Sequence, residues 1–276
     1  MFRPVCIYND ERMWMHLARI YPLFSGSSGN AEFIGTPSGG ILIDCGVSAR
    51  RLTQALARCG IPADAVQGIF ITHDHSDHVA GLRVFTKKYK IPVYAQPITR
   101  QYLFDGNYLE PEQECRALTG TVECAGIRVT PFATSHDTAQ SCGYRMELPD
   151  GRTCAVCTDL GYVSEEVAAA LSGCDLVLLE ANYDKEMLRT GPYPGYLKMR
   201  IASEVGHLSN DDCAAAAETL LQSGTTRLIL GHLSQHNNLP ELAESTVERA
   251  LSSFRRGSDY LLQTAPPETD GRMIGF

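Results

Sequence analysis

The sequence predicts an α+β fold in which two β-sheets pack face to face and helices cover both outer surfaces, a four-layer αββα sandwich. Short β-rich runs separated by turn residues dominate the first half of the chain, whereas strands recur together with helices in the second half. The 276 residues are 44% hydrophobic, which is enough for a large buried core. No repeat array or linker divides the pattern.

Apolar runs in the first half alternate with glycine, serine, asparagine and proline, which predicts strands joined by tight turns. Gly60 and Pro62 end the first predicted helix. The expected strands are residues 20–24, 31–36, 40–44, 68–72 and 92–95. The expected helices are residues 50–59, 78–89 and 99–104.

Two helix starts are marked in the second half. Ser164 precedes two glutamates, and we expect Asn210 or Asp211 to cap an alanine-rich helix. Strands are expected within residues 121–133 and at 143–148, 153–158, 175–180, 227–230 and 260–263. Helices are expected at 164–171, 210–223 and 241–254.

Residues 1–18 do not share this pattern. They contain Trp14, the only tryptophan, and their hydrophobic residues follow neither the helix nor the strand period. We therefore expect an N-terminal extension over residues 1–18 and a single domain over residues 19–276.

The chain is expected to be a soluble cytoplasmic protein. Its apolar runs fall far short of the roughly 18 residues of a membrane span, and no secretory signal precedes them. The ten cysteines are scattered, so we expect reduced thiols. Cys154 and Cys157 form a C-x-x-C pair in a predicted strand, where residues three apart point to opposite faces, and are expected to be buried thiols.

The net charge of −8 gives no support for nucleic-acid binding through a broad basic surface. A nucleic-acid substrate is still compatible with this charge, because two divalent metal ions would place concentrated positive charge where the phosphate must lie.

A dense group of candidate metal ligands follows the predicted strand 68–72. His73 and His75 are two residues apart, and Asp77 and His78 open the next helix. Imidazole and carboxylate are the ligands of borderline divalent metals, and four of them within six positions can serve two adjacent ions. A polar loop with Asp77 as a helix cap is the alternative.

Three more candidate ligands each follow an apolar strand: His136, Asp159 and His232. Each could be a capping or turn residue by itself. Together they predict that the strand ends converge at one edge of the sandwich and complete the metal site.

This ordered set of residues resembles the metallo-β-lactamase superfamily over nearly the whole chain. The resemblance implies an αββα sandwich with a two-metal site, in which Asp159 bridges the ions. A bridging aspartate is typical of the hydrolase and phosphodiesterase branches. The implied ligands are His73, His75 and His136 for one ion, and Asp77, His78 and His232 for the other.

Local segments narrow the resemblance to the bacterial WalJ (YycJ) branch, which implies 5′-to-3′ DNA exonuclease activity. His236 departs from this pattern, because an acidic residue is expected after the last ligand. The matching segments are residues 23–30, 180–184, 191–194, 206–210 and 231–234.

His207 resembles the extra histidine that ribonuclease Z-type enzymes place beside the leaving group, where a glutamate like Glu180 holds it. A histidine held by a carboxylate can donate a proton to a departing oxygen. A simple helix cap is the alternative for His207. Asp77 could orient the attacking water in addition to ligating a metal.

Candidate substrate contacts are less specific. Ser27 and Asn30 lie in a loop whose backbone N–H groups and hydroxyls could receive a phosphate, although a hairpin turn without function fits equally well. Lys198 belongs to a group of cations interleaved with tyrosines, which suits contact with nucleic acid. A solvated loop explains this group nearly as well. Its other cations are Lys185, Arg189 and Arg200.

The sequence therefore predicts a phosphodiester hydrolase that uses hydroxide generated by two divalent ions (zinc, manganese or iron), with DNA as its substrate and 5′-to-3′ exonuclease activity. A small-molecule hydrolase acting on a thioester, lactone or cyclic phosphate is one alternative. A non-catalytic regulatory protein linked to cell-wall signalling is the other.

Overall fold

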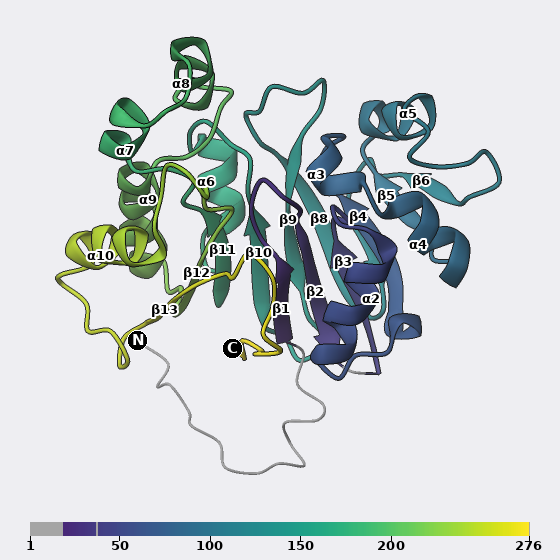
Figure 1. Ribbon diagram of the computed structural model, residues 1–276. Coiled ribbons are helices and arrows are strands. Elements are labelled where there is room, and N and C mark those ends of the chain that lie inside the picture. Colours follow the sequence, from purple (N-terminus) through teal and green to yellow (C-terminus); the bar gives the residue numbers. More distant parts are fainter. Residues whose placement is uncertain (1–18, 37, 276) are drawn as a thin grey trace.

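The computed structural model describes residues 19–36 and 38–275, which form two mixed β-sheets with helices on both outer surfaces (Figure 1). The predicted αββα sandwich is confirmed. The predicted extension over residues 1–18 lies outside the described residues, and a single domain over 19–276 stays a prediction.

The first sheet has six strands in the order of the sequence. Its first three strands are antiparallel neighbours and the remaining pairs are parallel. The strands are β1 (Arg19–Phe24), β2 (Ala31–Thr36), β3 (Gly39–Ile43), β4 (Val66–Ile71), β5 (Val93–Ala95) and β6 (Cys115–Ala117).

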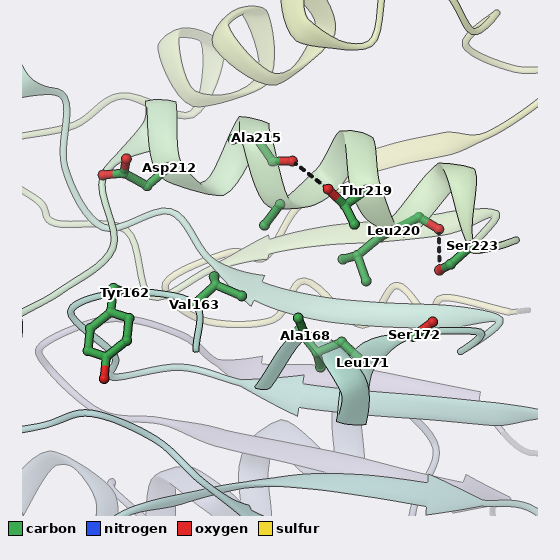
Figure 2. A pocket seen from close by; sticks show the side chains of 11 residues that line it. Tyr162, Val163, Ala168, Leu171, Ser172, Asp212, Ala215, Thr219, Leu220 and Ser223 are labelled. Atoms are coloured by element: carbon green, nitrogen blue, oxygen red, sulfur yellow. Dashed lines mark hydrogen bonds between the residues drawn. The ribbon is translucent and has the colours of Figure 1, made fainter. Parts of the chain in front are cut away.

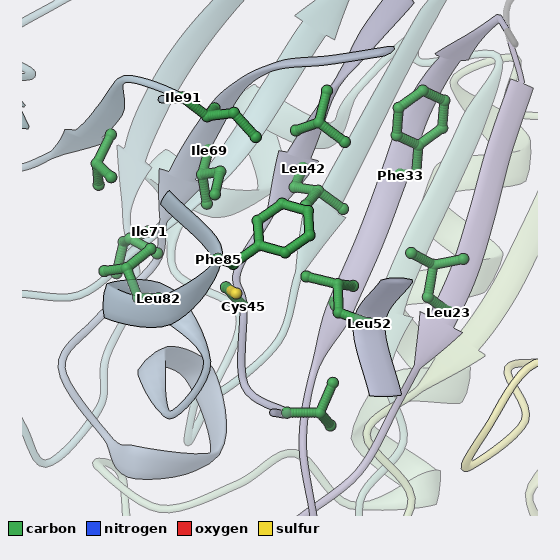
Figure 3. Packing of buried hydrophobic residues seen from close by; sticks show 14 of the residues in the cluster. Leu23, Phe33, Leu42, Cys45, Leu52, Ile69, Ile71, Leu82, Phe85 and Ile91 are labelled. Carbon is green, nitrogen blue, oxygen red and sulfur yellow. The ribbon is translucent and has the colours of Figure 1, made fainter. Parts of the chain in front are cut away.

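Helices α2 (Ala49–Arg58) and α4 (Leu82–Tyr89) cover the outer face of the first sheet (Figure 1). Leu52 and Phe85 from these helices pack against Leu42 and Ile69 of the strands (Figure 3). Successive residues of a strand face opposite sides of a sheet. In β2, Phe33 therefore packs under the covering helices, whereas Ile34 packs in the core between the two sheets.

The second sheet has seven strands in the order β13-β12-β11-β10-β9-β8-β7. It is antiparallel from β7 to β10 and parallel from β10 to β13. The strands are β7 (Val122–Cys124), β8 (Ile127–Ala133), β9 (Cys142–Glu147), β10 (Thr153–Cys157), β11 (Leu176–Glu180), β12 (Arg227–Gly231) and β13 (Leu261–Thr264). Its outer face packs against α6 (Glu165–Leu171), α9 (Asn210–Gln222) and α10 (Pro240–Ala250).

The core between the sheets contains side chains from both, including Ile41, Phe70 and Tyr144. Cys154 faces this core, whereas Cys157 faces the helices on the outer side, as the three-residue spacing predicts. The nine cysteines within the described residues are all free thiols, so the predicted thiols are confirmed there.

The single helix predicted over residues 78–89 is wrong. The structure has α3 (Ser76–Val79) and α4, separated at Ala80 and Gly81. The N–H of Gly81 donates to the carbonyl of Cys45, and a Cβ on Gly81 would lie 1.9 Å from the carbonyl oxygen of Val47. This close backbone approach breaks the helix.

Other differences concern short elements. The prediction lacks β6, α7 (Lys185–Thr190) and α8 (Gly195–Ile201), and α5 (Pro97–Asp105) is longer than expected. Ser209, rather than Asn210 or Asp211, caps α9, since its side chain accepts from the N–H of Asp212. A 3₁₀ turn, η1 (Ala63–Ala65), precedes β4. Every helix in residues 19–36 and 38–275 is too short or too polar to cross a bilayer.

Replacing Phe85 tests the packing of α4 on the first sheet. Phe85 is fully buried, so F85A removes a ring and leaves a cavity, and we expect a loss of about 3–5 kcal/mol in the free energy of unfolding measured with urea. The neighbouring Val84 is 58% exposed, and V84A should change stability by no more than about 0.5 kcal/mol. Equal effects of the two substitutions would contradict the packing described.

Candidate metal centre

The predicted ligands lie at one edge of the sandwich, in loops that follow strands and in the short helix α3, which contains Asp77 and His78. His73 and His75 follow β4, and His136, Asp159 and His232 follow β8, β10 and β12. Two of these residues have left-handed backbone conformations, with φ of 59° at Asp159 and 54° at His232. Non-glycine residues seldom adopt such φ values, and they are concentrated at functional sites.

The structure brings all seven predicted metal ligands together, in four overlapping groups of candidate ligand atoms within the described residues. Asp159 belongs to two of them, one with His73 and His78 and one with Glu180, His207 and His232. His73, His75 and His136 form the third group, and Asp77, His78 and His232 form the fourth. Within each group, the atoms lie within 4.8 Å of one another. The third and fourth groups are the two sets that the resemblance implies for the two ions.

Asp159 lies between these two sets. One carboxylate oxygen, Oδ1, is 3.7 Å from Nε2 of His136 and 3.4 Å from Nδ1 of His232, while Oδ2 is 3.3 Å from Nε2 of His78. The side chain is almost fully buried. A carboxylate placed in this way can contact an ion in each set.

A second layer of residues orients the histidines. Nδ1 of His78 lies 2.7 Å from Oδ2 of Asp44, and the N–H and hydroxyl of Thr72 both donate to this carboxylate. Nδ1 of His136 lies 3.0 Å from the carbonyl oxygen of Gly206. Partners on Nδ1 fix the ring so that Nε2 faces the centre, which is the usual arrangement around metal-binding histidines.

Glu180 holds two histidines at once. Its Oε1 is 2.7 Å from Nδ1 of His232 and 2.9 Å from Nδ1 of His207, and its Oε2 accepts from the N–H groups of Leu160 and Leu208. Burial opposes ionisation of Glu180, but His207 and His232 outweigh it and hold its pKa well below the usual range. The carboxylate is therefore charged and fixed.

The pKa values of two histidines in the centre, His78 and His73, are shifted in opposite directions. Burial disfavours the imidazolium form of His78, but Asp44 and Asp159 outweigh this effect and raise its pKa to about 9. Burial and the neighbouring histidines hold the pKa of His73 well below its usual value, so this ring is neutral, the form that ligates metals.

The buried polar atoms of the centre fit a divalent cation. Among the described residues, His73 Nε2, His232 Nε2, Asp137 Oδ1 and Asp159 Oδ2 are buried without a hydrogen-bond partner. Buried polar atoms are normally paired, so four such atoms in one cluster indicate a missing partner. Imidazole nitrogen and carboxylate oxygen are donors for a divalent metal.

The centre opens into a hollow of about 260 Å³. Asp77 and His207 line it with partly exposed side chains, where a substrate could reach them. The remaining lining comprises Ser27, His75, His136, Asp137, Asp159, Asn182, Tyr193, Leu197, Arg200, Ile201, Gly206, His232 and Ser234.

The predicted substrate contacts have different surroundings. Ser27 lines the hollow, but Asn30 is buried, with its amide nitrogen 3.0 Å from Nε2 of His78. Lys198 is not part of the lining, and its amine donates to the carbonyl of Arg189. His236 packs edge-on against the ring of Tyr193. Substrate contact by Ser27, Asn30 or Lys198 stays a prediction.

Sequence reasoning missed several supporting residues. Asp44 follows β3 as the ligands follow their strands, and this shared position was the available signal. The second contact of Glu180, with His232, had no sequence signal. Asp137 is adjacent to His136, and its carboxylate accepts a hydrogen bond from Nε of Arg200.

A second hollow, of about 390 Å³, lies between α6 and α9 (Figure 2). Its lining is mostly apolar, with Leu171 and Leu220 facing it and Asp212 as its one carboxylate among the described lining residues. None of the four candidate metal-ligand groups uses a residue of this lining, so the smaller hollow at the strand ends is the candidate functional site.

Comparison with known proteins supports the same interpretation. The family model described as "Beta-lactamase superfamily domain" matches residues 40–233. The chain is 36% identical over 253 residues to "Exodeoxyribonuclease WalJ" of Streptococcus pneumoniae serotype 2, which covers 90% of this chain and 94% of that protein. It is 38% identical over 252 residues to "Exodeoxyribonuclease YycJ" of Bacillus anthracis, covering 89% of this chain and 94% of that protein.

The fold is also found in a solved structure. The metallo-β-lactamase fold protein YhfI from Bacillus subtilis superposes with a TM-score of 0.68 at 14% identity, covering 91% of this chain and 98% of that one. This likeness shows the fold, and the histidine and aspartate cluster indicates divalent metal binding. The chain therefore belongs to the β-lactamase superfamily, and it is a metal-dependent hydrolase with the metallo-β-lactamase fold.

Proposed function

We propose that this protein is an exodeoxyribonuclease that binds two divalent ions and removes nucleotides in the 5′-to-3′ direction. The observation that carries the proposal is Asp159, whose buried carboxylate lies close to histidines of both candidate ligand sets, His136 of one and His78 and His232 of the other. Two-ion sites of this kind suit phosphodiester hydrolysis. The relatives named exodeoxyribonuclease, matched over nearly their whole length, support DNA as the substrate.

In this proposal His73, His75 and His136 would hold one ion, Asp77, His78 and His232 would hold the other, and Asp159 would serve both. The donor set is compatible with zinc, manganese or iron. The nine free thiols among the described residues suit a reducing compartment such as the cytoplasm, where we place the reaction.

Divalent ions bound here would supply Lewis-acid activation of water and neutralise charge on the phosphoryl group. Asp77 is the side chain placed to orient the attacking water, since its carboxylate is partly exposed to the hollow while Oδ2 lies 3.6 Å from Nε2 of His78. Ser27, which also lines the hollow, offers a hydroxyl to a phosphate oxygen.

His207 is the proposed proton donor to the departing oxygen. Its Nδ1 is bound to Glu180, which leaves Nε2 for the substrate and stabilises the protonated ring. Burial opposes this charge, but Glu180 outweighs it and raises the pKa of His207. The raised pKa favours the protonated ring, which is the form that can give a proton to the leaving group.

End-labelled duplex DNA tests the proposed reaction. With manganese or zinc, we expect a 5′ label to be released as mononucleotide from the earliest times, while a 3′-labelled strand shortens progressively. H73A should lower the rate at least about 100-fold, because even partners of metal ligands contribute about 10–100-fold. Metal content per chain, measured by mass spectrometry, should fall in parallel.

His236 provides the control for this assay. It is the described histidine outside all four candidate ligand groups, and its side chain is exposed. H236Q should retain both metal and activity. If no metal supports DNA cleavage while a thioester or lactone is turned over, the nuclease proposal is wrong and a small-molecule hydrolase takes its place.

The role of His207 predicts a distinct kinetic signature. In H207Q, kcat on DNA should fall about 10²- to 10⁴-fold, the usual contribution of general acid catalysis, while KM and metal content stay near wild type. Steady-state kinetics with metal analysis check this. Wild-type kcat in H207Q would refute the role of proton donor, and loss of metal would instead assign His207 to the ligand set.

A further inference from the structure

We infer that Arg200, oriented by Asp137, binds a backbone phosphate of the nucleic-acid substrate beside the metal centre. The inference rests on the proposed function, because it identifies a substrate contact in the same hollow. Arg200 is the only Lys or Arg among the described residues that line this hollow.

Asp137 connects Arg200 to the metal centre. Its Oδ1 lies 3.4 Å from Nε2 of His136 and 3.7 Å from Nε2 of His75. Its Oδ2 accepts a hydrogen bond from Nε of Arg200. One carboxylate therefore has the candidate ligands of one ion on one side and a guanidinium on the other.

The contact with Asp137 leaves the phosphate-binding end of Arg200 available. Nε is occupied, while the two terminal nitrogens have no hydrogen-bond or ion-pair partner among the described residues, and the side chain is 57% exposed. These nitrogens form a planar fork that matches two oxygens of a phosphate. Asp137 fixes the direction of this fork in advance, which lowers the entropic cost of binding.

The other cations that the sequence groups with Arg200 have different partners. Lys185 lies 3.4 Å from Asp211, Arg189 pairs with Glu186, and Lys198 donates to a backbone carbonyl. None of these three cations lines the hollow. Of the four cations that the sequence places together, Arg200 is therefore the one that a substrate in the hollow could contact.

The rest of the wall around Arg200 suits a nucleotide. Arg200 belongs to α8, which together with the preceding residues also contributes Tyr193 and Leu197 to the lining, and α8 projects beyond the sheets at the end where the ligand loops lie (Figure 1). An aromatic ring beside a phosphate-binding cation is a combination that contacts single strands through both backbone and base.

Substitution of Arg200 in the full-length protein tests this inference. R200Q should raise KM for a labelled oligonucleotide about tenfold or more, the loss expected for a charge-assisted hydrogen bond. It should weaken binding of the same oligonucleotide to the metal-free protein by a similar factor, measured by fluorescence anisotropy. The slope of log Kd against log salt should fall by about one, and metal content should not change.

Two further variants distinguish phosphate binding by Arg200 from a purely structural role, in which its contact with Asp137 only holds α8 in place. R200K keeps the charge without the fork and should recover only part of the affinity. Arg255 has the same kind of contact, Nε to an aspartate oxygen of Asp259, outside the hollow, so R255Q should match wild type.

Several outcomes would overturn the inference without touching the proposed function. If wild type degrades DNA and R200Q keeps its KM, Kd and salt slope within twofold, Arg200 does not bind the phosphate. If R200Q loses thermal stability and kcat while its DNA affinity is unchanged, the role of Arg200 is to stabilise the position of α8 and not to bind DNA. Conversely, weaker DNA binding by R200Q in a protein that never cleaves DNA would support the phosphate contact and refute the proposed reaction.

Discussion

The placement of Asp159 between two groups of histidines is the constraint on which the site depends. Its carboxylate and the rings of His73 and His232 are nearly inaccessible to solvent. Burying such groups without partners is costly, and in this cluster some atoms are paired with one another while others remain without a partner. A divalent cation would satisfy those atoms, so metal binding and the stability of this edge of the fold are coupled.

The sandwich meets this constraint through its strand ends. The core between the sheets fixes the strands, so the residues that follow β4, β8, β10 and β12 reach the same edge. Asp44 and Asp159 follow their strands in the left-handed conformation, with φ of 61° and 59°. Asp44 then holds His78 from behind while Asp159 faces it from the centre, so the two loops position one ring. The chemistry of the site is therefore built from local turns on a rigid scaffold.

Much of this could be predicted from the sequence, because polar residues after apolar strands leave a local pattern, and that pattern indicated the seven candidate ligands that the structure brings together. The supporting contacts leave no such pattern. Asp137 and Arg200 are 63 residues apart, and the two histidines that share Glu180 are distant from it in the chain. Helix α8 was missed because the glycines and prolines before it are typical of a turn. The break before α4 depends on a backbone contact between Gly81 and Cys45 that only the tertiary fold creates.

The most direct test of the two-ion centre is a crystal structure of the manganese- or zinc-loaded protein with anomalous scattering measured at the metal edge. We expect two anomalous peaks roughly 3.5–4 Å apart, with one Asp159 oxygen bound to each. His73, His75 and His136 should surround one peak, and Asp77, His78 and His232 the other. A single peak in the fully loaded protein, or two peaks with Asp159 bound to neither, would contradict the two-ion centre.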